Sequence, residues 1–376
     1  MTYAVRARLT SGLSTPCTLV LSLALLAGLA GGCSGSGGSH RSQSGRITAR
    51  SNENLPSNSK SLLSPSEIGV TVGGGLNYSL PGAFKAVSKA GVGWVRMTIA
   101  WSWVEPEKGR FDFSKYDLAV TAGRSAGLEI LGTLGLGVLW DTAAPPGVLG
   151  NERLDYPPNS MSDWNGYVRS TVSHYKNSIH YWEIWNEPDL EGFWHGTPGQ
   201  YARLLANSYT DIKAVDPSAQ VLLGGLSLAG TPGQYDPDFF SQILSNKAYP
   251  AGKFFDIANF HQYGSEHEAL IRDSYVNSQM TQIGLHRPIW VTEVGYSSDP
   301  SLQKLAGYSK GTGQGNQAGY LRDMVEYLEH GLRVKKSFWF SIQDNPKLGP
   351  EFSNYGLLTS SNLPKQALKE IGQLEK

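Results

Sequence analysis

Eight apolar stretches alternate with eight helix-favouring stretches between residues 68 and 374. The expected strands cover residues 68–72, 93–100, 129–134, 180–186, 221–225, 255–261, 288–293 and 336–342. The expected helices cover residues 81–91, 115–126, 162–175, 198–215, 239–244, 266–283, 316–330 and 364–374. Eight strand–helix units within roughly 310 residues predict an α/β fold, a (β/α)8 TIM barrel with enlarged loops, over residues 65–376.

A doubly wound open sheet is the competing architecture, because it also alternates strands with helices. Proteins of that class that bind nucleotides carry a glycine-rich phosphate turn after the first strand. Residues 73–77 read GGGLN here and lack the G-x-G-x-x-G spacing. The sequence therefore favours the closed barrel and gives little support for a nucleotide site.

The first 33 residues have the features of an export signal. Arg6 and Arg8 precede an apolar run at residues 19–30, and the run ends in Ala30-Gly31-Gly32-Cys33. The run is shorter than the ~20 residues of a membrane-spanning helix. The ending resembles a bacterial lipobox, with Ala30 where Leu is usual. We expect residues 1–33 to be a lipoprotein signal peptide with lipid on Cys33, and cleavage without lipidation is the alternative.

Residues 34–64 are rich in Ser, Gly and Asn and have almost no apolar periodicity, which predicts a flexible tether. The only two cysteines are Cys17 and Cys33. The expected barrel therefore contains no thiol for a disulfide or for catalysis.

The formal net charge of zero argues against nucleic acid as a partner and suits a neutral ligand. Ten Trp and eighteen Tyr residues supply rings that pack in a core or against sugars. We expect a monomer with a carbohydrate substrate.

Two glutamates follow buried strands at distant places in the chain. Glu187 lies in WEIWNEPDL, residues 182–190, and Glu293 lies in PIWVTEVGYSS, residues 288–298. Functional side chains of a (β/α)8 barrel gather at the carboxyl ends of its strands. Strand alternation also places Glu183, Trp185 and Glu187 on one face. Paired carboxylates at such a mouth are the groups that a retaining glycosidase needs.

The motifs W-N-E-P and T-E-V-G resemble the acid/base and nucleophile motifs of the clan A glycoside hydrolases, nearest to family 39. The segment RMTIAWSWVEPEKGRFDFSKYD, residues 96–117, is similar to the second-strand segment of that clan. The resemblance implies that Glu187 is the acid/base and Glu293 the nucleophile, with neither metal nor organic cofactor. Glu105, in the E-P turn, is expected to be structural.

The same resemblance assigns further residues to the site. Arg96 would keep the nucleophile ionised, and the alternative is a buried pair with Glu183. Tyr263 would hydrogen-bond the nucleophile, and Asn186 would bind the sugar 2-hydroxyl. His261 would line the sugar site, with a satisfied core histidine as its alternative, because no second His or Cys lies at metal-ligand spacing.

Four tryptophans are candidate sugar contacts. Trp339 matches the residue that often forms the floor of the −1 subsite in clan A, and Trp101, Trp140 and Trp194 lie near other expected strand ends. Sugar faces present C–H groups that pack on aromatic rings. For each of the four residues, packing within the barrel is the alternative.

The sequence therefore predicts a retaining glycoside hydrolase acting by double displacement, with endo-action on a polysaccharide favoured. An exo-acting, xylosidase-like β-glycosidase is the alternative, as are a sugar-binding barrel without hydrolysis and a lipid-anchored scaffold. Related clan A families such as family 5 stay open.

Overall fold

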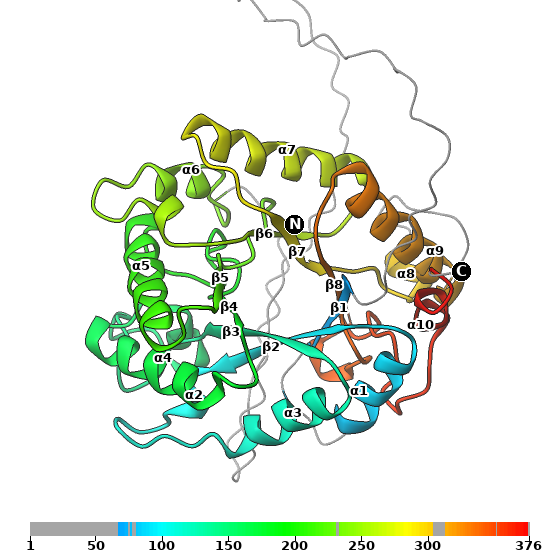
Figure 1. The fold of residues 1–376 in the computed structure, drawn as a ribbon, viewed down its shortest axis with the longest axis horizontal. Helices are drawn as coiled ribbons and strands as arrows, with labels where there is room; N and C mark the ends of the chain where they lie inside the picture. Colours follow the sequence, from blue (N-terminus) through cyan, green and yellow to red (C-terminus); the bar gives the residue numbers. More distant parts are fainter. Residues whose placement is uncertain are drawn as a thin grey trace, which may run out of the picture.

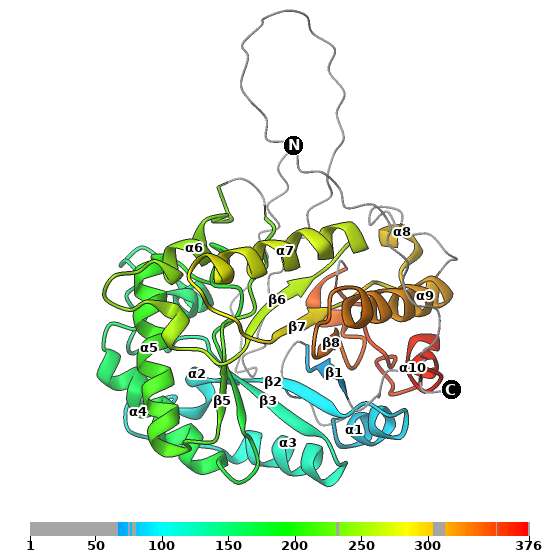
Figure 2. The same cartoon turned by 45° about the horizontal axis from the view of Figure 1, so that its top comes forward.

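The computed structural model describes residues 67–73, 76, 80–230, 233–303, 313–350 and 352–374. The signal peptide and the tether expected at residues 1–64, together with Cys33, lie outside the described residues. The described strands form one curved parallel sheet with helices around its outside, as Figures 1 and 2 show from two directions. The predicted (β/α)8 barrel is confirmed.

The eight strands are short and almost entirely buried. They are β1 (Ile68–Thr71), β2 (Trp94–Ala100), β3 (Glu129–Gly135), β4 (Tyr181–Ile184), β5 (Gln220–Leu222), β6 (Ala258–Gln262), β7 (Ile289–Val294) and β8 (Ser337–Phe340). Their order around the sheet is β5-β4-β3-β2-β1-β8-β7-β6. Parallel bridges from Leu222 to Ile257 and from Leu226 to Phe260 join β5 to β6 and close the barrel.

The helices surround the barrel, and the longer ones follow their strands in sequence. They are α1 (Leu80–Lys89), α2 (Trp101–Val104), α3 (Ser114–Ser125), α4 (Met161–Tyr175), α5 (Pro198–Val215), α6 (Phe239–Leu244), α7 (Glu266–Gln282), α8 (Pro300–Gln303), α9 (Gly313–Glu326) and α10 (Gln366–Ile371). Shorter turns are η2 (Gly150–Asp155), η3 (Ala251–Lys253), η4 (Tyr327–Gly331) and η5 (Pro346–Leu348).

Reciprocal capping fixes where the two longest helices begin. Thr197 and Gln200 exchange side-chain and backbone hydrogen bonds at the start of α5, and Ser265 and Glu268 do the same for α7. Each pair satisfies two N–H groups that have no partner inside the helix. None of the helices in the described part of the chain is both long and apolar enough to cross a membrane.

Several element boundaries differ from the sequence prediction. Trp101 begins the short helix α2, which the sequence did not predict, and the last turn expected for the helix at residues 316–330 is the π-helical turn η4. Ladder pairing of β4 stops at Ile184, where Trp185 takes a left-handed backbone with φ of 73°. The strand ends therefore separate into loops earlier than apolar patterning indicates.

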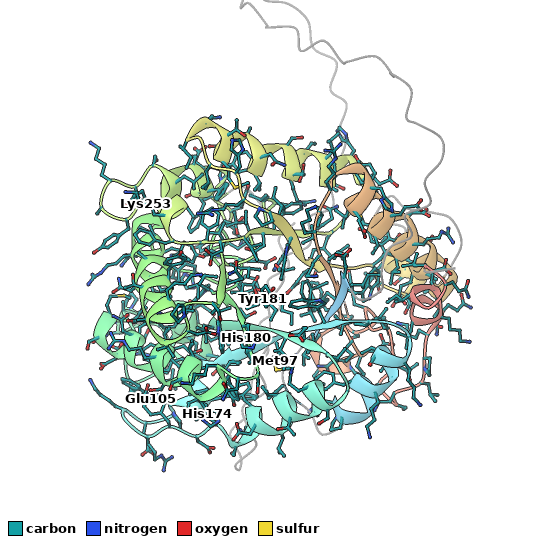
Figure 3. All side chains as sticks on the ribbon, in the orientation of Figure 1. Met97, Glu105, His174, His180, Tyr181 and Lys253 are labelled. Carbon is teal, nitrogen blue, oxygen red and sulfur yellow. The ribbon has the colours of Figure 1, made fainter. Side chains whose placement is uncertain are left out.

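Side chains fill the inside of the barrel as well as the space between the barrel and its helices. In Figure 3, Tyr181 lies near the barrel axis and Lys253 at the outer rim. One cluster closes the amino-terminal end and consists of Trp94, Leu131, Leu222, Ile257, Trp290 and Phe338, with Tyr181 against it. Gly69 makes room for this cluster, because a Cβ at residue 69 would lie 2.2 Å from the Phe338 ring. With this end filled, the site is left to the opposite, carboxyl-terminal mouth.

Candidate active site

Glu187 and Glu293 both lie at the carboxyl-terminal mouth of the barrel. Glu293 belongs to β7, whereas Glu187 lies three residues beyond β4 with a left-handed φ of 44°. The Glu187 N–H donates to the Gly225 carbonyl at 3.1 Å, which ties this loop to the end of β5. The two side chains are only 2% and 1% exposed. Left-handed residues with a side chain are uncommon and concentrate at functional sites.

The expected shared face of Glu183, Trp185 and Glu187 is wrong. The left-handed geometry of Trp185 interrupts the alternation, and its ring packs on Trp164 and Trp194 in the hydrophobic core. Asn186 instead joins Glu183 in contacting the same arginine, Arg96.

Arg96 holds three side chains at once from β2. Its Nε donates to Glu183 Oε2 at 2.5 Å, its Nη1 to Glu293 Oε1 at 2.7 Å and its Nη2 to Asn186 Oδ1 at 2.8 Å. Both contacts considered for Arg96, one with Glu293 and one with Glu183, are therefore present together. Burial disfavours the charge of Arg96, but Glu183 and Glu293 outweigh that effect and raise its pKa. The guanidinium is thus a fixed positive charge against Glu293.

Tyr263 and His261 complete the contacts of the two acids. The Tyr263 hydroxyl donates to Glu293 Oε2 at 2.6 Å, as the resemblance implied. His261 Nδ1 lies 2.8 Å from Glu187 Oε1 and 3.8 Å from Glu293 Oε2. His261 thus contacts the two acids directly, a contact that the sequence did not indicate.

Burial raises the pKa of Glu187 to about 8; Arg96 and Arg272 lower it and Glu183 raises it. The carboxyl group is therefore protonated at neutral pH. The carboxylate that contributes to this rise in pKa is Glu183, below the two acids. At neutral pH Glu187 is thus a proton donor beside Glu293, which accepts hydrogen bonds from Arg96 and Tyr263.

Burial also lowers the pKa of His261 to about 4, so its ring is neutral at neutral pH. The ring fits beside the acid because residue 225 is glycine, where a Cβ would lie 2.2 Å from His261 Nε2. A neutral imidazole orients Glu187 without supplying a second positive charge to the site.

A family model described as "Glycosyl hydrolase catalytic core" matches residues 156–374. The chain belongs to this family. A second model, described as "Beta-galactosidase", matches residues 79–164. The matched regions together contain both glutamates and the segment that carries Arg96.

A beta-xylosidase of Geobacillus stearothermophilus is 29% identical over 118 residues, which is 29% of this chain and 22% of that protein. The match thus spans about a fifth of the relative's length. A family 39 glycoside hydrolase from Bacteroides cellulosilyticus WH2 aligns with a TM-score of 0.63 and 21% identity, over 84% of this chain and 64% of that one. A monomeric beta-xylosidase from Caulobacter crescentus CB15 aligns with a TM-score of 0.60 and 18% identity, over 82% and 68%. These structures share the barrel fold.

A hollow beside Glu293 opens to solvent in this glycosyl hydrolase family member. Glu293, Asn186 and Arg96 line one side of it. Asn186 Nδ2 is buried and has no partner in the described residues, so it is free to donate to a ligand hydroxyl. The remaining lining is apolar or hydroxyl-bearing, and includes Thr71, Val72, Leu76, Thr98, Trp103, Leu136, Trp185, Phe193 and Phe340.

The expected tryptophan contacts are mostly packing contacts. Trp101 is fully buried and donates from Nε1 to Glu105 Oε2 at 2.7 Å, which also gives Glu105 its expected structural role. Trp339 is buried, donates to the Tyr355 carbonyl and does not line the hollow. Trp194 is buried against Trp185. Neither Trp101 nor Trp339 lines the hollow, and a contact of either ring with a sugar stays a prediction.

Two other tryptophans have different positions. Trp140 is half-buried, packs on Trp101 and lies outside the hollow, so its contact with a sugar stays a prediction. Trp103 is half-buried and lines the hollow, with Lys115 Nζ 4.6 Å from its ring centre. The sequence did not single out Trp103. Its spacing of two from Trp101 on α2 was the available signal, since the two rings point to opposite sides of one turn.

The part of the chain that the structure describes has no group of three or more His, Cys, Asp or Glu residues arranged to hold a metal ion. His261 contacts two carboxylates, and each of these carboxylates is committed to other partners or to the acid role. At the mouth, one protonated carboxyl group, Glu187, thus lies near a second one, Glu293, which accepts hydrogen bonds.

Proposed function

We propose that this chain is a retaining glycoside hydrolase in which Glu187 is the acid/base and Glu293 the nucleophile. The observation that supports this proposal is that the two buried carboxyl groups, Glu187 and Glu293, have different surroundings. Glu293 accepts hydrogen bonds from the Arg96 guanidinium and the Tyr263 hydroxyl. Burial keeps Glu187 protonated to about pH 8. A protonated acid and a second carboxyl group held by hydrogen-bond donors are what double displacement requires.

In the first step a Glu293 carboxylate oxygen bonds to the anomeric carbon while the glycosidic C–O bond breaks. The Glu187 proton passes to the leaving oxygen, which departs as an alcohol. In the second step Glu187, now ionised, takes a proton from water as the water oxygen bonds to the anomeric carbon. The bond from the anomeric carbon to Glu293 breaks in the same step, and both acids return to their starting states.

The position of His261 supports short spacing of the two acids. Its Nδ1 lies 2.8 Å from Glu187 Oε1 and 3.8 Å from Glu293 Oε2. The two oxygens are therefore at most about 6.6 Å apart, the sum of those distances, which admits the ~5–5.5 Å of retaining enzymes. This bound also meets the lower end of the ~6.5–9.5 Å range of inverting enzymes, and the anomeric configuration of the product separates the two mechanisms.

Glu293→Gln tests the assignment directly. We expect turnover to fall by ~10⁴-fold or more, because the substitution removes the covalent catalyst. Proton NMR of the first product should show the anomeric configuration of the substrate. Glu105→Gln is the matched control, since Glu105 is also buried but bonds to Trp101 and the Gly109 N–H and does not line the hollow. Inversion of configuration, or near wild-type turnover by Glu293→Gln, would reject the mechanism.

For the substrate we propose endo-action on a neutral polysaccharide. The hollow is open, mainly apolar and hydroxyl-bearing, and its charged residues, Arg96 and Glu293, are already paired with each other. An exo-acting β-xylosidase is the second candidate, favoured by the sequence match to a beta-xylosidase. Early products from xylan and other neutral polymers separate the two: mixed oligosaccharides support endo-action, and monosaccharide alone supports the second candidate.

We further propose that the enzyme is exported and held at a bacterial cell envelope by lipid on Cys33, and that it acts as a monomer. The sequence features of residues 1–64 support this location. The alternative is release after cleavage without lipidation.

A further inference from the structure

Glu183 lies beneath the two acids, inside the barrel, and takes no direct part in the proposed chemistry. It belongs to β4 and is fully buried. Its carboxylate accepts hydrogen bonds from Arg96 Nε at 2.5 Å, Thr133 Oγ1 at 2.6 Å and Asn259 Nδ2 at 2.6 Å. Three donors from β2, β3 and β6 thus converge on one carboxylate.

The guanidinium of Arg96 is planar and rigid, so fixing one nitrogen fixes the directions of the others. Glu183 holds Nε, while Nη1 donates to Glu293 and Nη2 donates to Asn186. We infer that Glu183 is a positioning residue, which sets the nucleophile and the Asn186 amide through one guanidinium. This inference rests on the proposed function.

Glu183 also supplies charge. Arg96 faces two carboxylates, Glu183 and Glu293. One positive charge against two negative charges leaves this cluster with a net negative charge. The negative charge of Glu183 contributes to the raised pKa of Glu187. The other charged or titratable groups that face Glu187 are Arg96, His261, Tyr263, Glu293, Asp189 and, from α7, Arg272.

The neighbours of Glu183 allow its charge to be removed with little change of shape. In Glu183→Gln the new carbonyl oxygen is able to accept from Arg96 and Thr133. Asn259 Oδ1 has no partner in the described residues. If the Asn259 amide turns over, this oxygen accepts from the new amide and from the Thr292 hydroxyl, which lies 3.0 Å from Asn259 Nδ2. Glu183→Gln therefore removes the negative charge of residue 183 while keeping its size and its hydrogen-bond partners.

The test compares wild type, Glu183→Gln and Glu105→Gln by kcat, KM and the pH dependence of kcat/KM on an unactivated oligosaccharide, whose leaving oxygen needs the proton of Glu187. We expect Glu183→Gln to lower kcat by ~10²-fold with KM near wild type, as displacement of a catalytic group by about 1 Å does. Its alkaline limb should move to lower pH, because Glu187 loses a negative neighbour. A residue with a purely structural role changes the melting temperature but leaves that limb in place.

Glu105→Gln should behave in the second way, because Glu105 accepts from Trp101 Nε1 and the Gly109 N–H, away from Arg96. If Glu183→Gln does not fold, Thr133→Val serves in its place, because it removes one donor to Glu183. This variant should lower kcat about tenfold, and its alkaline limb should move less than that expected for Glu183→Gln. Wild-type kcat with an unmoved limb in the folded variant would overturn the inference and leave the double displacement intact. A wild-type enzyme that cleaves no glycoside would reject the proposed function itself.

Discussion

The ionisation of Glu187 sets the alkaline side of activity, because only the protonated carboxyl group serves the leaving oxygen. Its pKa is raised to about 8 by burial. We therefore expect kcat/KM to fall as pH rises through about 8. In Glu187→Gln the limb should disappear, and an activated leaving group or added azide should restore part of the lost rate. pH–rate profiles of the two proteins measure this; an identical alkaline limb in both would contradict the assignment.

The same pKa shift carries a cost in stability. An ordinary glutamate ionises near 4.5, whereas Glu187 keeps its proton to about 8. Between these values the unfolded chain has released a proton that the folded chain retains, so the contribution of Glu187 to stability falls as pH rises. Glu187→Gln should therefore melt at a higher temperature than wild type, by a margin that widens from pH 5 to pH 8. Calorimetry at several pH values tests this, and a constant margin would mean that Glu187 is not buried as an acid.

At this scale the sequence predicted the identity of the site better than its geometry. Glu187 and Glu293 were predictable because strand ends meet at one mouth of a barrel. The contact of Asn186 with Arg96 and that of His261 with Glu187 were not, because they depend on the left-handed backbone of Trp185 and on the missing Cβ of Gly225. Both features depend on tertiary contacts that no local pattern encodes.

On the element α2, two tryptophans two residues apart have opposite environments. Trp101 is enclosed by Trp164, Tyr167 and Trp140, whereas Trp103 lines the hollow. Trp101→Ala should lower the free energy of unfolding by ~3–5 kcal/mol, since it leaves a cavity. Trp103→Ala should weaken oligosaccharide binding while the melting temperature changes little. Denaturant unfolding and binding calorimetry on both variants separate the roles, and a reversed pattern would show that the two rings had been assigned to the wrong surfaces.

Element boundaries were the weaker part of the fold prediction. All eight strands were found, yet β4 and β5 pair over only part of the stretches expected. Apolar patterning reports burial, and Trp185 stays buried after ladder pairing has ended. In the loops that hold the site, residues thus stay buried after the strand pairing has ended.

At the scale of the whole molecule, the chain combines a barrel mouth with an amino-terminal segment of different composition. If Cys33 carries lipid, Cys33→Ala should leave the protein unprocessed or release it from the membrane fraction. Cys17→Ala is the matched control, because Cys17 precedes the apolar run and should not change anchoring. Cell fractionation with metabolic labelling by a fatty acid measures both. A Cys33→Ala protein that is processed, labelled and sedimented like wild type would reject the anchor, while the barrel and its two acids would keep their proposed roles.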